Sequence, residues 1–385
     1  MFNYPHAISS KLPKVGTTIF TVMSELAQKH NAINLSQGFP DFAVDPRLIE
    51  LVNYHMKIGN NQYPPMPGII SLRERLSLKM KASYGTEYDP DTEITIAAGA
   101  TQALFTAITA FISEGDEVII FTPAYDCYAP AVELAGGKPV YIQLQPKDFS
   151  IDWNQVKKVV SRKTKMIIIN SPHNPSGSII DANDLDELAN ITRGNDIIVL
   201  SDEVYEHIVF DNAKHMSLAS HKELIDRSLI VYSFGKTFHV TGWKTGYIVG
   251  PENLMKEFRK VHQFNVFTAN APIQYAISDY LADHSNYAQV SEEYQRKRDV
   301  FIDAVKSSRF DLTPTKGTYF QLLNYKNISD QDDEEFAVRL TKDHKIASIP
   351  ISVFYHNPVQ NKVLRFCFAK EEETLLRAGE IISNL

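Results

Sequence analysis

The sequence has 385 residues, a length that suggests roughly two or three structural units. Of these residues 44% are hydrophobic and 22% charged, a composition typical of a folded globular protein. Its formal net charge of −7 argues against a large basic surface for nucleic acid, although a small anionic ligand can still bind a locally basic pocket. No apolar run approaches the length of a membrane span, and the first residues lack the pattern of a signal peptide, so no membrane partner is expected.

The first predicted element is a helix from Thr17 to His30, preceded by an irregular stretch that we expect to form an extended arm. Four apolar residues recur at the i, i+3, i+4 and i+7 positions of one helical face, namely Ile19, Val22, Met23 and Leu26. Polar and proline-rich loops then alternate with helical patterns as far as residue 93.

From Glu93 to about Gly250, short β-branched runs alternate with helical stretches. The runs are continuously apolar, as expected of strands covered on both faces. This pattern predicts an α/β fold with a mostly parallel central sheet sandwiched between helices. The predicted strands are 94–96, 117–121, 139–142, 166–169, 196–200, 229–232 and 246–249.

After about residue 283 the pattern changes to that of a smaller α+β domain. A charged helical stretch from Tyr287 to Ser307 precedes strand-like segments at 317–322 and 362–368. We therefore predict an N-terminal arm that forms part of the small domain (1–45), a large domain (46–282) and a small C-terminal domain (283–385). The two cysteines, Cys127 and Cys367, lack the spacing of a metal site, so no metal is expected and a reducing cytoplasm is the expected location.

Ligands of parallel α/β sheets bind beyond the carboxyl ends of the strands, so the residues after each predicted strand are candidates for a site. Gly99, Ala100 and Thr101 follow the first strand and begin a helix, where free N–H groups suit a phosphate. An ordinary strand-helix turn is the alternative. Tyr125 follows the second strand and offers its ring to a flat ligand, with a half-buried structural tyrosine as the alternative.

Five more polar residues follow the later strands. Asn174 lies in a rigid proline-rich turn that can direct its amide at a ligand oxygen. Asp202 ends an apolar strand, where a carboxylate needs a cation such as a protonated pyridine nitrogen. The alternative is that Asp202 only caps the next helix. Tyr205 follows three residues later and can reach the same ligand. Lys236 leaves another apolar strand, and desolvation there makes its amine available to form an imine; Lys244 follows eight residues later.

Arg365 lies in the strand-like segment 363–368, on the face opposite Leu364, Phe366 and Phe368. Its guanidinium group can bind a carboxylate through two parallel hydrogen bonds. An arginine on a solvated strand face is the alternative.

The order Asn-Pro-x-Gly, Asp-x-x-Tyr and Ser-x-x-Lys-x7-Lys resembles the class I and II aminotransferases, which have the aspartate-aminotransferase-like fold and use pyridoxal 5′-phosphate (PLP). The resemblance covers nearly the whole chain, and it is closest to the methionine, kynurenine and glutamine aminotransferase branch. The segments that favour this branch are 36–42, 61–63, 171–175 and 236–244. The resemblance implies that the large domain binds PLP.

The resemblance implies a role for each matching residue. Lys236 forms an imine with the cofactor and later moves the substrate proton, while Asp202 pairs with the ring nitrogen. Asn174 and Tyr205 bind the phenolic oxygen of PLP, and Tyr125 stacks on the ring. The implied phosphate site consists of Gly99, Ala100, Thr101, Ser233 and Lys244, together with Tyr63 from a second subunit, which implies a homodimer.

The resemblance also implies a substrate site. Arg365, Asn174 and the backbone of Gly38 are expected to bind the substrate there, with Arg365 holding the carboxylate. The candidates for the side-chain pocket are all apolar and comprise Ile19, Phe20, Phe267 and Phe354. Departures from the family pattern are Ser176 for the usual Thr, Gly235 for a common Ser, and Thr101 for an aromatic residue common in kynurenine enzymes; the last opens room beside the substrate.

The sequence thus predicts an aminotransferase that moves an amino group from an apolar, sulfur-containing or aromatic amino acid to a 2-oxo acid by a ping-pong mechanism. Methionine-like and phenylalanine- or kynurenine-like donors are the first expectations. A PLP-dependent β-lyase acting on cysteine S-conjugates or cystathionine is the alternative with the same site. A non-catalytic PLP-sensing domain is the alternative of another class, and we disfavour it because the resemblance leaves no room for a preceding DNA-binding module.

Overall fold

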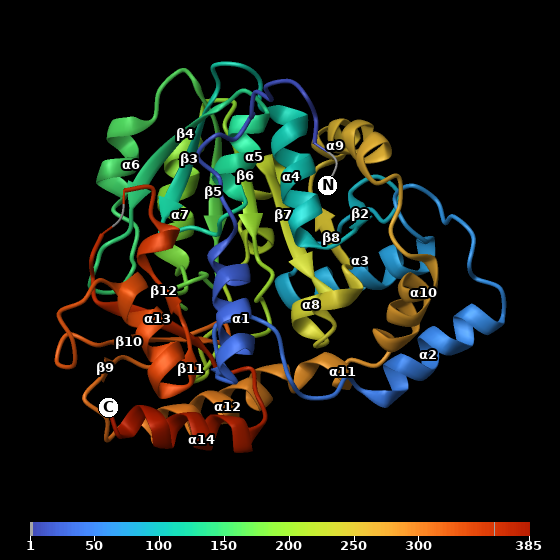
Figure 1. The fold of residues 1–385 in the computed structure, drawn as a ribbon. Helices are drawn as coiled ribbons and strands as arrows, with labels where there is room; N and C mark the ends of the chain where they lie inside the picture. The colour runs from blue at the N-terminus through green and yellow to red at the C-terminus, as the bar shows by residue number, and fades with distance from the viewer. Residues whose placement is uncertain (1–2, 358) are drawn as a thin grey trace.

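The computed structural model describes residues 3–357 and 359–385, and its centre is a seven-stranded sheet with the order β2-β8-β7-β6-β5-β3-β4 (Figure 1). Neighbouring strands run parallel except where β8 pairs antiparallel with β2 and β7. The prediction of a mostly parallel sheet is confirmed, with every predicted strand present. The strands are β2 (Ile94–Ala97), β3 (Glu117–Thr122), β4 (Lys138–Gln143), β5 (Thr164–Asn170), β6 (Ile198–Asp202), β7 (Ser228–Ser233) and β8 (Gly246–Val249).

Helices cover both faces of this sheet. In β5, Met166 and Ile168 belong to one apolar cluster, whereas Ile167 and Ile169 belong to another. Because successive strand residues point to opposite faces, both clusters need apolar side chains, which explains the continuous runs. The first cluster includes α4 (Ala100–Phe111), α5 (Tyr128–Leu134) and α9 (Glu252–Asn265); the second includes α3 (Ile70–Tyr84), α6 (Trp153–Val159), α7 (Ala182–Thr192) and α10 (Ala271–Tyr280), against which α2 (Pro46–Lys57) packs.

A second, antiparallel sheet with the order β12-β13-β10-β9 lies in the C-terminal part (Figure 1). The predicted charged helix forms α12, after the short α11, and α12 packs side by side with α14. The two predicted strand-like segments form β10 and β13. The elements are α11 (Ser285–Ala288), α12 (Val290–Val305), β9 (Asp311–Leu312), β10 (Phe320–Asn324), α13 (Asp333–His344), β11 (Ile346–Ala347), β12 (Ile349–Pro350), β13 (Val363–Cys367) and α14 (Glu372–Ser383).

The N-terminal segment packs against this C-terminal part. α1 (Ile19–His30) contacts α13, and β1 (Ile33–Asn34) pairs parallel with β11. The predicted apolar face of α1 is only partly correct, because Met23 and Ala27 are buried whereas Val22 is 42% exposed. The division into 1–45, 46–282 and 283–385 stays a prediction. None of the described helices is long and apolar enough to cross a membrane.

Candidate active site

The carboxyl ends of β5, β6 and β7 and the start of α4 meet at a cavity of about 150 Å³. Every cofactor residue predicted from the sequence lines this cavity, except Tyr63. These residues are Gly99, Ala100, Thr101, Tyr125, Asn174, Asp202, Tyr205, Ser233, Lys236 and Lys244. Residues far apart in the chain converge here because parallel strands end at the same edge of a sheet.

Lys236 lies in α8 (Phe234–Thr237), a short helix that directly follows β7. Its Nζ donates hydrogen bonds to the Tyr319 hydroxyl at 2.7 Å and to the Gly38 carbonyl at 3.4 Å. Burial lowers the pKa of Lys236 from 10.5 to about 8. More of the amine is therefore neutral near pH 7 than in an exposed lysine, and the neutral amine is the form that attacks a carbonyl.

Asp202 ends β6 and is 4% exposed. The Tyr128 hydroxyl donates a hydrogen bond to Oδ2 of Asp202 at 2.6 Å. Among the described residues, Asp202 has no ion-pair partner. Burial raises the pKa of Asp202 to about 6, and the hydrogen bond from Tyr128 opposes this effect. A buried carboxylate without a cation is costly, and the protonated ring nitrogen of PLP would supply the missing positive charge.

The N-terminus of α4 faces the same cavity and suits a phosphate. Gly99 precedes the helix with a φ of +82°, and as the N-cap residue it has no side chain that could cap the free N–H groups. A Cβ atom on Gly99 would lie 3.5 Å from Nζ of Lys244, so this position brings bare backbone next to a lysine ammonium. Backbone N–H groups at a helix start and a nearby cation are the usual elements of a phosphate site. Together with Asp202 and Lys236, these residues fit PLP.

Arg365 lies on β13 and is 1% exposed. Its guanidinium carbon is 3.8 Å from the ring centroid of Phe320, 5.1 Å from that of Phe354 and 5.3 Å from that of Phe20. Its Nε has no hydrogen-bond partner within the described chain, and burial lowers the pKa of the group to about 10. The alternative of a solvated strand face is therefore wrong, because aromatic side chains cover the face that carries Arg365.

Asn174 connects the cofactor cavity to Arg365. Its Oδ1 accepts a hydrogen bond from Nη1 of Arg365 at 2.7 Å, and its main-chain N–H donates to Oδ1 of Asn170 at 2.8 Å. With Oδ1 engaged by the arginine, the Nδ2 group is left to donate to a ligand oxygen in the cavity. This geometry is compatible with contacts to both the cofactor and the substrate.

The remaining predicted residues divide into two groups. Phe20 and Phe354 lie beside Arg365, and their ring centroids are 5.9 Å apart. Ile19, which precedes Phe20 in α1, is half-buried. Tyr63 and Phe267 are instead 84% and 41% exposed. Their rings contact each other outside the cavity, with centroids 5.6 Å apart. Within one chain, Phe267 is therefore not part of the predicted side-chain pocket.

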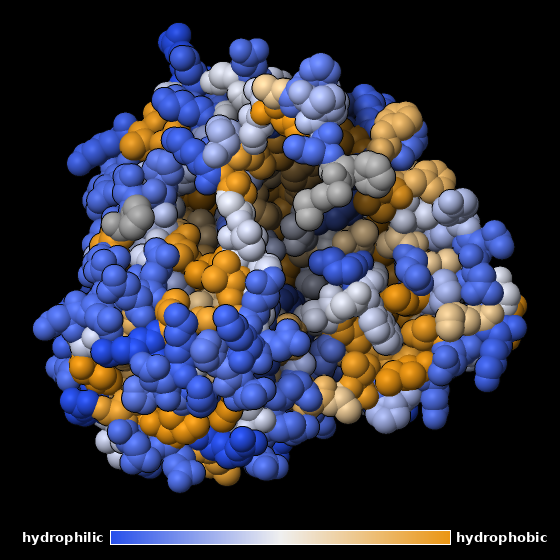
Figure 2. All heavy atoms as spheres, in the orientation of Figure 1, coloured by the Kyte–Doolittle hydropathy of each residue, from blue (hydrophilic) through white to orange (hydrophobic). Residues whose placement is uncertain are grey.

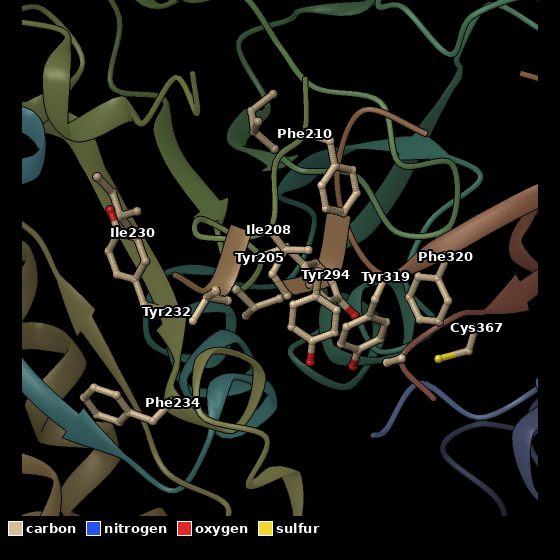
Figure 3. Close-up of a cluster of buried hydrophobic side chains, with 14 of the residues drawn as sticks. Tyr205, Ile208, Phe210, Ile230, Tyr232, Phe234, Tyr294, Tyr319, Phe320 and Cys367 are labelled. Carbon is tan, nitrogen blue, oxygen red and sulfur yellow. The ribbon is translucent and has the colours of Figure 1, made fainter. Parts of the chain in front are cut away.

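Two tyrosines of the site, Tyr128 and Tyr319, were not predicted from the sequence. Tyr128 could have been inferred, because it begins α5 three residues after Tyr125 and a buried Asp202 needs a hydrogen-bond donor. Tyr319 has no local signal, because it reaches Lys236 from the C-terminal part of the chain. Figure 3 shows the Tyr319 ring among those of Tyr205 and Tyr294.

The described residues contain no group of three or more His, Cys, Asp or Glu side chains that could hold a metal ion. Cys127 and Cys367 are free, and burial raises the pKa of both thiols.

Comparisons with known proteins identify the family of this chain. The family "Aminotransferase class I and II" matches residues 30–382. The methionine aminotransferase of Escherichia coli is 47% identical over all of both chains, and the crystal structure of E. coli YbdL, described as a methionine aminotransferase, has a TM-score of 0.97 and covers 99% of this chain and 100% of its own. Kynurenine–oxoglutarate transaminase 1 of Rattus norvegicus is 32% identical over 96% of both chains. The chain therefore belongs to the class I and II aminotransferases and is a PLP-dependent enzyme that transfers amino groups.

Proposed function

We propose that the enzyme transfers the amino group of a methionine-like or aromatic amino acid to a 2-oxo acid. The observation that carries this proposal is the aromatic surround of Arg365, whose guanidinium group lies within 5.3 Å of the rings of Phe20, Phe320 and Phe354. A substrate whose carboxylate binds Arg365 would place its side chain near these rings, where apolar and sulfur-containing groups pack well. The names of the E. coli and rat relatives refer to substrates of the same kind.

The proposed roles follow from the chemistry of each residue. PLP supplies a carbon that receives the amino group and a ring that accepts the electron pair left when the substrate Cα loses its proton. Lys236 holds the cofactor covalently and, as a free amine, takes that proton at Nζ. Asp202 keeps the ring nitrogen protonated, Tyr205 and Asn174 bind the phenolic oxygen, and Tyr125 covers the ring.

We further propose that the enzyme acts as a homodimer in which Tyr63 of a second copy binds the cofactor phosphate, beside Gly99, Ala100, Thr101, Ser233 and Lys244. A contiguous exposed apolar patch marks a surface that a partner can cover. Tyr63 is 84% exposed and Phe264 is 86% exposed. Hydrophobic residues also gather on the surface beside α2 and α10 (Figure 2).

The substrate proposal is tested by incubating the enzyme with methionine, phenylalanine or kynurenine and a 2-oxo acid, and by measuring the new amino acid formed. Lys236→Ala should abolish transfer, whereas Lys260→Ala, which removes an exposed lysine of α9, should leave it intact. Pyruvate release from cystathionine without amino transfer would instead indicate a β-lyase. Failure of all three amino acids as donors would contradict the proposal.

The dimer proposal is tested by mixing two inactive variants, Lys236→Ala and Tyr63→Ala. If each site combines Lys236 of one copy with Tyr63 of the other, a mixed dimer contains one intact site and activity returns. If both residues act within one chain, every site stays defective and mixing restores nothing.

A further inference from the structure

Tyr319 occupies the space between Lys236 and the loop that carries Gly38. Its side chain is 0% exposed, its hydroxyl oxygen lies 2.7 Å from Nζ of Lys236, and it also hydrogen-bonds to the Gly38 carbonyl. The rings of Tyr205 and Tyr294 pack against it, with centroids 5.1 Å and 5.7 Å away (Figure 3). The position of the hydroxyl is thus fixed by packing on several sides.

The direction of these hydrogen bonds follows from the groups involved. The Gly38 carbonyl can only accept, so the Tyr319 hydroxyl donates its proton to it. The phenol oxygen then has lone pairs but no proton for Lys236, and it accepts an N–H from Nζ. A neutral amine bound through its N–H keeps its own lone pair free.

We propose that Tyr319 is a positioning residue that orients the free amine of Lys236 and leaves its lone pair available for the substrate proton. The inference rests on the proposed role of Lys236. It goes beyond that role because it identifies the group that fixes the base when the amine is released. A tyrosine that donated to Nζ would have the opposite effect, since it would occupy the lone pair.

The contact also makes the amine depend on the loop around Gly38. This loop is held by the C-terminal part of the chain, where Nζ of Lys370 donates to the Phe39 carbonyl at 2.8 Å and the main-chain N–H of Glu371 donates to Oδ1 of Asp41 at 2.6 Å. Tyr319 therefore connects the amine to a segment expected to bind the substrate carboxylate.

The test compares Tyr319→Phe with Tyr294→Phe. Both remove one buried hydroxyl from the same aromatic cluster, but the Tyr294 hydroxyl contacts Nδ1 of His239 and not Lys236. The first readout is the rate at which an amine-reactive reagent labels Lys236 across pH, measured by mass spectrometry on the full-length chain freed of cofactor. The second is kcat and KM of the holoenzyme.

The Tyr319 oxygen accepts a hydrogen bond from Nζ of Lys236, and such a bond stabilises the ammonium form more than the neutral amine. Loss of this hydrogen bond in Tyr319→Phe should therefore lower the pKa of Lys236 by about half to one unit. Tyr319→Phe should also lower kcat about tenfold with little change in KM, because the amine loses its orientation rather than the substrate its binding site. Tyr294→Phe should change neither quantity.

An unchanged labelling profile or an unchanged kcat in Tyr319→Phe would overturn the inference, as would the same shift in Tyr294→Phe. Circular dichroism and thermal melting verify that both variants fold. If Lys236→Ala retains amino transfer, the proposed function itself fails. If Lys236→Ala is inactive but Tyr319→Phe behaves as wild type, only the inference about Tyr319 fails.

Discussion

A buried ion pair behind the active site provides a sharp test of how this fold is held together. Lys79 of α3 and Glu206, which follows β6, are 6% and 3% exposed at their side chains, and Nζ lies 2.7 Å from both carboxylate oxygens. The Tyr84 hydroxyl donates to Glu206 at 2.5 Å. Burial alone would raise the pKa of Glu206, but the Lys79 ammonium and these hydrogen bonds lower it to about 2. Glu206 directly follows Tyr205, so the pair also anchors a segment of the site.

Lys79→Met keeps most of the apolar side chain and removes the charge. The fall in the pKa of Glu206 from 4.5 to about 2 corresponds to roughly 3 kcal/mol in favour of the ionised form, and breaking one side of a buried pair costs about 3–5 kcal/mol. We therefore expect Lys79→Met to destabilise the protein by about 3 kcal/mol or more. Lys79→Met combined with Glu206→Gln should recover most of this loss, because no buried charge is left without a partner.

The assay is urea unfolding followed by circular dichroism at pH 7 for the wild type, the single variant and the double variant. Lowering the pH towards 5 should reduce the deficit of Lys79→Met, because the buried Glu206 then takes up a proton more easily than it would in water. Equal unfolding midpoints for Lys79→Met and wild type would refute this reasoning. A double variant no more stable than the single variant would refute it as well.

Three smaller perturbations test other parts of the site. Gly38→Ala would place a Cβ 2.7 Å from Cζ of Phe320, so we expect KM for the amino acid to rise about tenfold with the fold preserved, as steady-state kinetics would show. Asp202→Asn should lower kcat at least about a hundredfold while the melting temperature changes little; a nearly unchanged kcat would contradict the assigned role. The free energy of unfolding should fall between pH 6.5 and 4, because burial lowers the pKa of His173 and His207 to about 4 and only the unfolded chain protonates them there; the raised pKa of Asp202, about 6, opposes this in part. Urea titrations at several pH values would measure the slope, and a flat profile would count against it.

The fold class and much of the cofactor site could be predicted from local sequence. Strands buried on both faces must be apolar at every position, so the runs that became β3, β5 and β6 were visible without any structure. Asp202 and Lys236 were visible for a related reason, because each stands directly after such a run, where parallel strands open onto a shared edge.

The partners of these residues were decided by tertiary structure. Arg365 hydrogen-bonds to Asn174, which is 191 residues away in the sequence, and Lys236 hydrogen-bonds to Tyr319, which is 83 residues away. The period of a strand tells which face a side chain occupies but not what covers that face, so β13 alone could not distinguish a solvated Arg365 from a buried one. The sequence by itself therefore determined which chemical groups the protein has and where its strands end. Only the tertiary packing decided which of these groups meet. The C-terminal part brings Tyr319 to Lys236 and places Phe320 beside Arg365, to which α1 adds Phe20. The packing of the loops before α3 and after α9 places Tyr63 against Phe267 at the surface. These contacts depend on how separate elements fit together and not on local periodicity.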